Sequence, residues 1–335
     1  MMSMKMMIKQ LVGGIATSSI LAPVMRRSLQ SSINIIYYHR VGTPPSYYKS
    51  FFSGCTYERF ERDLDVLQSY FQFVSLEDML LGERVTGDKP AAALTFDDGF
   101  SLIGNGVMDL LNRRGIRATT LVITECLDNR QLMWRHKLSA VLAETPNAQA
   151  LRAYNQIASA NALPTASSPS EIIRVSFEMP METKDELMDE WWARCGMQPL
   201  PAYLAAHQPY FTWEELRTWR KNGHSVGLHT ATHVSCSRLA PDAVDKEIVA
   251  PARELRTALD AKVLPFSYPF GHRLPPTIAE SLYRDGMIDC VLGIQGYATV
   301  GAPLHRLERA NGEVELEYSV LGKPALMNAR RAMGF

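Results

Sequence analysis

Two kinds of segment alternate along most of the chain. From about Ile33, short runs of β-branched and aromatic residues, such as INIIYYHRV and RATTLVIT, are typical of buried strands. Between such runs lie longer segments whose apolar residues recur every three or four positions. In TYERFERDLDVLQSY these residues are Phe60, Leu64 and Leu67, which mark one face of a helix.

The same rhythm continues to the C-terminal part of the chain. Later strands are expected at AAALTF, HSVGLHT, VLPFSYPFG and CVLGI, with helices at GNGVMDLLNRRG, TWEELRTWRKNG, DAVDKEIVAPARELRTAL and PPTIAESLYRDG. Strands separated by single helices imply parallel βα units. About seven units in a chain of this length predict a distorted or incomplete seven-stranded (β/α) barrel, with a doubly wound open sheet as the alternative.

The rhythm is interrupted between about residues 126 and 210. There MWRHKLSAVLAE and KDELMDEWWARCG have helical spacing, whereas NALPTASSPSEI is typical of a loop. We therefore expect one barrel domain over residues 31–320 with a helical insertion at about 126–210. A tail or surface helix over residues 1–30 precedes it, and a C-terminal tail over residues 321–335 follows.

Composition and charge narrow the classes of function. Hydrophobic residues make up 46% of the chain and charged residues 21%, which is ordinary for a globular protein. The 35 basic and 35 acidic residues cancel, so no basic footprint for a nucleic acid is visible. The five cysteines are scattered without a Cys-x-x-Cys pair, which favours reduced, buried thiols over disulfides.

The N-terminal segment carries an ambiguous targeting signal. Lys5 and Lys9 precede the run LVGGIATSSILAPVM, and two arginines follow it. The run is too short to span a bilayer, is diluted by glycine and serine, and lacks a clear cleavage site. We expect a cytoplasmic protein, with peripheral membrane contact through residues 5–27 or secretion by a weak signal as the alternatives.

Polar residues with catalytic chemistry collect at the ends of predicted strands. His39 follows the first strand, Asp97 and Asp98 follow AAALTF, and His229 and His233 follow HSVGL. In parallel βα architectures the carboxyl ends of the strands form one rim, which carries the active site. These side chains should therefore converge if the barrel prediction holds.

Two histidines and two carboxylates at one rim suggest a catalytic metal site. His229 and His233 are four residues apart, a spacing that places two side chains on one face of a helical turn. Two imidazoles and one carboxylate leave open positions on a divalent ion. The second carboxylate could then act as a general base, and Gly99 would permit the tight turn that points both into one cavity.

The motifs resemble the polysaccharide deacetylase family, also known as the NodB-homology domain or carbohydrate esterase family 4. TFDDG, HTATH and a variant third motif, SYPFG, stand in the family order, and INIIYYHRV resembles the subgroup that includes poly-N-acetylglucosamine deacetylases. The likeness extends over about residues 33–125 and 210–310. It implies a metal-dependent hydrolase that removes N-acetyl groups from the amino sugars of a polysaccharide or oligosaccharide, with that acetylated glycan as its partner.

The resemblance also implies a role for each matching residue. Asp97 corresponds to the catalytic base, and Asp98, His229 and His233 correspond to the ligands of one divalent metal ion. That ion is expected to be zinc, with nickel, cobalt, iron or manganese as alternatives. The backbone N–H of Phe270 corresponds to the group that stabilises the oxyanion.

Two positions depart from the usual pattern of the family. VLGIQGYAT has no histidine where a catalytic acid is usual, so the resembled subgroup implies His39, on the first strand, as the acid. The third motif usually begins with an arginine that orients the base, but Ser267 stands there. Arg309, in LHRLERANG, is the hypothesised replacement.

Other functions remain open at this point. The same chemistry could act on a small or lipid-linked amino sugar, or on an O-acetyl ester. A non-catalytic sugar-binding relative is a third alternative. The complete set of Asp97, Asp98, His229 and His233 argues against the last, because a binding module does not need all four.

Overall fold

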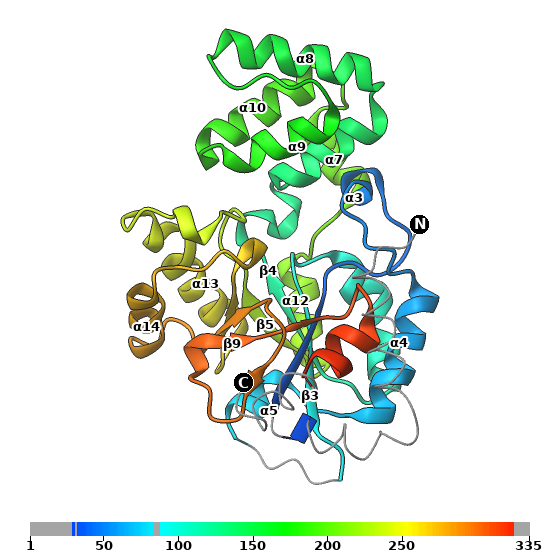
Figure 1. The fold of residues 1–335 in the computed structure, drawn as a ribbon, viewed down its shortest axis with the longest axis vertical. Coiled ribbons are helices and arrows are strands. Elements are labelled where there is room, and N and C mark those ends of the chain that lie inside the picture. The colour runs from blue at the N-terminus through cyan, green and yellow to red at the C-terminus, as the bar shows by residue number, and fades with distance from the viewer. Residues whose placement is uncertain (1–28, 31, 83–87, 325–335) are drawn as a thin grey trace. The chain divides into compact units, whose positions relative to one another are not determined.

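The computed structural model describes residues 29, 30, 32–82 and 88–324. The chain divides into two compact units, drawn as ribbons in Figure 1. The first unit comprises Met1–Gly42, Gly54–Leu127 and Tyr210–Phe335, and the second comprises Thr43–Ser53 and Asp128–Pro209. Most of the predicted tails, 1–30 and 321–335, and the membrane-contact segment 5–27 lie outside the described residues.

The first unit is built on a sheet whose strands follow the order β10-β1-β3-β4-β5-β6-β7-β9. Neighbours along this path are parallel, while β2 pairs with β3 and β8 runs antiparallel to β1. The strands are β1 (Ser32–Tyr38), β2 (Gln72–Phe73), β3 (Ala91–Phe96), β4 (Ala118–Val122), β5 (Ser225–Leu228), β6 (Pro265–Ser267), β7 (Cys290–Gly293), β8 (Ala298–Thr299), β9 (Leu307–Glu308) and β10 (Ala310–Asn311).

One short stretch of chain joins the two edges of this sheet. β9 pairs with β7 and β10 pairs with β1, and only Arg309 lies between β9 and β10. We call residues 307–313 the closing segment. The sheet is nearly closed, and the predicted distorted (β/α) barrel is confirmed.

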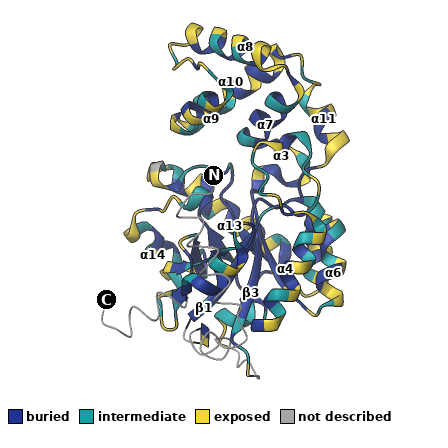
Figure 2. Cartoon of the chain, turned by 45° about the vertical axis from the view of Figure 1, so that its right-hand side comes forward, coloured by how far each residue is buried: buried dark blue, intermediate teal, exposed yellow. Residues whose placement is uncertain are grey.

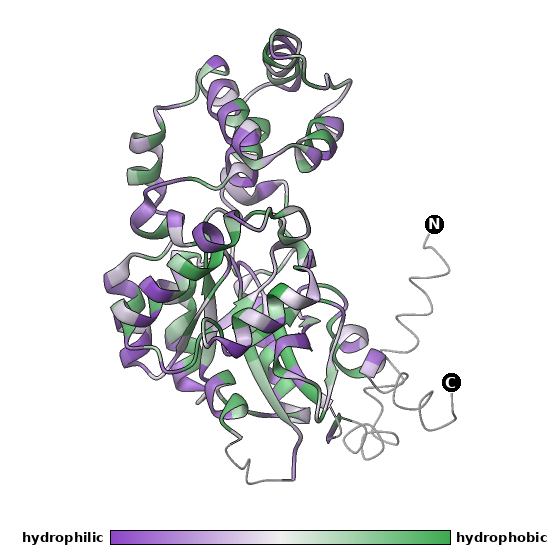
Figure 3. Cartoon of the chain, turned by 90° about the vertical axis from the view of Figure 1, so that its left-hand side faces the viewer, coloured by the Kyte–Doolittle hydropathy of each residue, from purple (hydrophilic) through white to green (hydrophobic). Residues whose placement is uncertain are grey.

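The strands form a continuous apolar core because both faces of each are covered. Ile35, Ala93, Leu121, Leu292 and Leu307 come from five different strands and pack in one buried cluster. Figure 2 shows the strands β1 and β3 as almost wholly buried, and Figure 3 shows the central strands as the most hydrophobic part of this unit. Burial on both faces is typical of parallel strands between helices.

Helices with one apolar face cover the outside of the sheet. The predicted stripe of Phe60, Leu64 and Leu67 is fully buried, and Thr212 forms a capping box with Glu215 at the start of α12. The helices of the first unit are α4 (Tyr57–Tyr70), α5 (Leu76–Leu80), α6 (Met108–Arg113), α12 (Trp213–Lys221), α13 (Ala250–Leu259) and α14 (Pro276–Arg284). Shorter helical turns are η1 (Ile103–Val107), η2 (Thr124–Asn129), η3 (Cys236–Arg238), η4 (Asp245–Val249), η5 (Pro269–Gly271), η6 (Leu304–Arg306) and η7 (Glu317–Gly322).

The second unit is helical. Its helices are α3 (Ser46–Lys49), α7 (Trp134–Glu144), α8 (Asn147–Ala160), α9 (Pro169–Glu178), α10 (Met181–Arg194) and α11 (Leu200–His207). The stretch Thr43–Ser53, which follows β1, also belongs to this unit, and no sequence pattern predicted this. The Ser139 hydroxyl holds it there by donating to the Ser46 carbonyl and accepting from the Ser50 N–H.

All five cysteines are buried and free, which confirms the prediction of reduced thiols. Within residues 29, 30, 32–82 and 88–324, helices long and apolar enough to cross a bilayer do not occur.

Candidate active site

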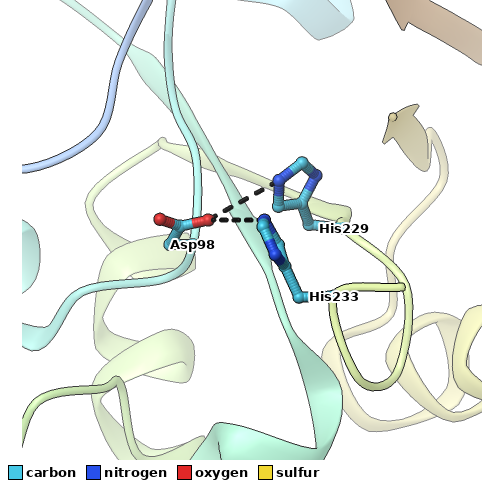
Figure 4. Close-up of side chains that lie close together, drawn as sticks. All are labelled: Asp98, His229 and His233. Carbon is cyan, nitrogen blue, oxygen red and sulfur yellow. Dashed lines mark ion pairs between the residues drawn. The ribbon is translucent and has the colours of Figure 1, made fainter. Parts of the chain in front are cut away.

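Asp98, His229 and His233 form a buried cluster at the carboxyl ends of β3 and β5. Their ligand atoms all lie within 4.8 Å of one another. The Asp98 Oδ1 atom is 3.6 Å from His229 Nε2 and 3.3 Å from His233 Nε2. Figure 4 shows both imidazoles directed at this carboxylate.

A loop, and not a helix, brings the two histidines together. Residues 229–233 follow β5 without helical structure, and both Thr230 (φ 63°) and His233 (φ 64°) are left-handed. The Thr230 hydroxyl accepts a hydrogen bond from the His233 N–H at 2.9 Å. The four-residue spacing predicted that these two histidines lie close together, as they do in the structure. The helical turn expected from that spacing is wrong, because a loop holds them.

The turn that carries the two aspartates is equally constrained. Asp98 and Gly99 are both left-handed, each with φ 69°. A Cβ atom at Gly99 would lie 3.0 Å from Val122 Cγ1, so this glycine meets both a conformational and a steric requirement. Strained backbone of this kind persists where the surrounding structure fixes it, and it is frequent at functional sites.

The hydrogen bonds of His229 indicate that its Nδ1 is protonated and that its Nε2, which faces Asp98, has a free lone pair. Its Nδ1 lies 3.0 Å from the Ser267 carbonyl oxygen, which can only accept, so Nδ1 carries the proton. The Ser267 hydroxyl is 2.6 Å from the same nitrogen. The lone pair of His229 Nε2 then faces Asp98 Oδ1, a buried oxygen without a well-formed hydrogen bond among the described residues.

This arrangement fits a cation between the three side chains. Burial lowers the pKa of His229, which keeps the imidazole neutral. Burial would raise the pKa of Asp98, but the hydrogen bond and charge of His233 outweigh it and hold that pKa well below its usual value. A neutral His229 imidazole and an ionised Asp98 carboxylate are the protonation states that metal ligands require, and a bound cation would take the place of the His233 proton that Asp98 now accepts. A second hydrogen bond from the outer nitrogen, as His229 makes, is typical of ligating histidines.

Asp97 lies beside this cluster and is held by Arg309. The guanidinium donates from Nη1 to Asp97 Oδ1 at 2.6 Å and from Nη2 to Oδ2 at 2.8 Å, and Nη1 also donates to the Thr95 hydroxyl at 3.2 Å. Arg309 has no exposed surface. Burial alone would raise the pKa of Asp97, but the Arg309 charge and hydrogen bonds outweigh it, so the pKa is lowered.

His39, at the end of β1, is paired with Glu313. Glu313 Oε1 accepts from the His39 backbone N–H at 2.8 Å, and Glu313 Oε2 lies 3.0 Å from His39 Nδ1. Burial would lower the pKa of His39, but the Glu313 charge and hydrogen bond, with Asp98 and Asp97, outweigh it and raise this pKa to about 9. At neutral pH the imidazole is therefore protonated and can donate.

Phe270 is the last of the site residues predicted from the sequence, and it lies in η5, just after β6. Its backbone is left-handed, with φ 59°, and its ring packs edge-on against His233 with centroids 4.6 Å apart. The residue thus adjoins the cluster of Asp98, His229 and His233.

The family model described as polysaccharide deacetylase matches residues 84–285, which is more than half of the chain. The chain belongs to the polysaccharide deacetylase family. A search of curated proteins found no match.

Solved structures of deacetylases share the fold. The Streptococcus pyogenes deacetylase PplD, solved in complex with acetate, has a TM-score of 0.54 and 15% sequence identity, over 86% of this chain and 98% of that one. IcaB from Ammonifex degensii has a TM-score of 0.51 and 16% identity, over 87% of this chain and 97% of that one. At these identities the likeness concerns the fold.

The family match separates the site into two parts. Asp97, Asp98, His229, His233 and Phe270 lie within the matched residues 84–285. Three further residues, His39, Arg309 and Glu313, lie outside them, and the barrel brings them to the same rim.

Glu313 was missed by the sequence analysis. Its signal was weak: an acidic residue four positions after Arg309, in ERANGE. Only the pairing of β10 with β1 shows that this position lies beside His39.

Proposed function

We propose that the protein is a metal-dependent hydrolase that removes N-acetyl groups from amino sugars of a polysaccharide or oligosaccharide. Membership of the polysaccharide deacetylase family supports deacetylation of a glycan. One observation carries the finer assignment: three buried ligand groups adjoin a carboxylate held by arginine and an imidazole held by glutamate. This combination offers an ion site, a base and an acid in one place.

Asp98, His229 and His233 would hold the ion. Two nitrogen donors and one oxygen donor suit zinc, and they also accommodate nickel, cobalt, iron or manganese. When bound, such an ion polarises the acyl carbonyl and makes a water molecule more acidic.

The remaining residues would move the protons. The Asp97 carboxylate accepts a proton from the attacking water, whose oxygen forms a bond to the acetyl carbon. The Phe270 N–H donates to the oxyanion that develops on the carbonyl oxygen. The bond between this carbon and the sugar nitrogen then breaks, the nitrogen takes a proton from the His39 imidazolium, and acetate leaves.

The test is acetate release from acetylated chito-oligosaccharides by the purified protein. We expect release that stops with a chelator and returns when a divalent ion is added. The matched variant, Asp97→Asn, should retain the ion and lose turnover by at least about 10³-fold, because its amide cannot accept the proton.

Three outcomes would contradict the proposal in different ways. Acetate release that is unaffected by complete removal of metal would exclude the metal-dependent mechanism. Release from an O-acetyl ester but not from the N-acetyl oligosaccharide would indicate an esterase. A protein that binds the oligosaccharide without releasing acetate would be a sugar-binding relative.

A further inference from the structure

Two side chains of the closing segment reach the proposed base and the proposed acid. Arg309 reaches Asp97, and Glu313, four residues later, reaches His39. Asn311 ends β10 between them, and the chain bends after it. A single short segment therefore supports both the proposed base and the proposed acid.

Asn311 connects this segment to itself and to β1. Its Oδ1 atom accepts a hydrogen bond of 2.7 Å from the Glu313 N–H. Tyr37 and Asn311 are direct partners in the register of β1 and β10. The position of the Glu313 backbone is thus tied to a residue that pairs with Tyr37 on the neighbouring strand.

Tyr37 contacts both sides of the proposed proton transfer. Its ring packs edge-on against the His39 ring, with centroids 5.6 Å apart and planes at 81°. The Arg309 guanidinium carbon lies 4.8 Å from the centroid of the same ring, within the range of a cation–π contact. Tyr37 is 6% exposed, so neighbouring groups hold it on most sides.

Gly312 allows this close arrangement. A Cβ atom there would lie 2.3 Å from Tyr38 Cε2, so a side chain at residue 312 would push the closing segment away from β1. The Gly312 N–H donates to the Tyr37 carbonyl at 3.0 Å. Backbone contact and side-chain contact therefore fix the same pair of segments.

We propose that Tyr37 and Asn311 are positioning residues that hold the Asp97–Arg309 pair and the His39–Glu313 pair in a fixed mutual arrangement. Nothing in the motifs assigns either residue a role. The inference rests on the proposed function, since it concerns the acid and base of that reaction. Groups fixed in advance in a reactive geometry accelerate proton transfer, and small displacements are costly.

The experiment compares Tyr37→Leu, Tyr37→Phe and Asn311→Ala in the full chain, with acetate release as the assay. We expect Tyr37→Leu to lower kcat about 10- to 100-fold with KM within about twofold, because the ring contacts to both pairs are lost. Asn311→Ala removes the hydrogen bond to the Glu313 N–H alone and should lower kcat several-fold, whereas Tyr37→Phe keeps the ring contacts and should stay within about twofold of wild type. Metal content should stay unchanged in all three.

Tyr154→Phe is the matched control. Tyr154 is a fully buried tyrosine of the helical unit, and its hydroxyl donates to the Pro164 carbonyl at 3.2 Å. The loss of this hydroxyl should lower thermal stability without changing kcat.

A second readout separates positioning from a purely structural role. If Tyr37 acts through His39 and Glu313, Tyr37→Leu and Glu313→Gln should be non-additive in kcat, with the double variant losing less than the product of the single losses. Independent losses would overturn the proposal, as would a Tyr37→Leu protein with a lower melting temperature and unchanged kcat. A wild-type protein that releases no acetate would instead refute the proposed function itself.

Discussion

The proposed ligand side of the site and its proton-transfer side are built in different ways. The ligand side uses Asp98, His229 and His233, which follow two strands separated by one strand in the sheet. On the proton-transfer side, Asp97 and Arg309 are 212 residues apart, and His39 and Glu313 are 274 residues apart. The first depends on local turns, whereas the second exists only when the last strand segment closes the barrel.

This difference predicts that ion binding and turnover can be lost separately. Damage to the turns after β3 and β5 should remove both. Damage to the closing segment should remove turnover and leave the ion site. Three substitutions test this contrast between the two sides of the site, and they follow in order of decreasing expected effect.

The largest effect is expected for His229→Ala. It removes one of three ligands, so we expect loss of bound ion and a fall in kcat/KM of about 10³-fold or more. Metal analysis of the purified variant, together with acetate release, measures both. Full metal occupancy in this variant would refute the assignment of His229 as a ligand.

A mixed effect on stability and turnover is expected for Arg309→Leu. Removing the buried guanidinium leaves Asp97 ionised without its partner, which costs about 3–5 kcal/mol of unfolding free energy. Turnover should fall because Asp97 loses its orientation, while metal content of the folded protein stays near wild type. Chemical denaturation and metal analysis give the two quantities.

Arg309→Lys is the control for charge. A lysine keeps the positive charge but cannot make the bidentate contact with both Asp97 oxygens, so the stability and turnover of this variant should be intermediate. A leucine variant with wild-type turnover and an unchanged pH–rate profile would show that Arg309 does not orient the base.

The smallest effect, visible mainly as a pH shift, is expected for Glu313→Gln. Glu313 is the main group that raises the pKa of His39 to about 9 against the opposing effect of burial. Without it this pKa should fall to its usual value near 6.5 or below. An acid of this kind is active below its pKa, so the alkaline limb of kcat should move to lower pH.

The expected loss for this variant at pH 8 is about tenfold or more, because most of the imidazole is then deprotonated. Near pH 5 the loss should be smaller. The measurement is kcat from pH 5 to 10 for both proteins. An alkaline limb that stays in place would exclude His39, tuned by Glu313, as the proton donor.

The ligand side could be predicted from the sequence because its residues stand in short motifs at strand ends. TFDDG and HTATH each carry two of the four buried groups, and parallel strands place their ends at one rim. One prediction about the local backbone was wrong. The spacing of the two histidines suggested a helix, but they lie on a loop in which Thr230 and His233 are left-handed.

The proton-transfer side could be predicted only in part. Ser267 stands where the family usually has an arginine, which predicts that another arginine supports Asp97, and Arg309 contacts that carboxylate in the structure. Glu313 and Tyr37 gave no comparable signal, since their contacts depend on the register of β10 against β1. Likewise, no pattern marked Thr43–Ser53 as part of the helical unit, because only contacts with distant residues such as Ser139 define it.

The position of the closing segment has a consequence for the order in which the protein matures. The ribosome synthesises the chain from the N-terminus, so the three proposed ion ligands are all made before residue 307. A chain that ends before this residue would carry those three side chains, while Asp97 and His39 would still lack Arg309 and Glu313. We therefore expect competence for the proposed hydrolysis to be acquired last, when the closing segment pairs with both β7 and β1.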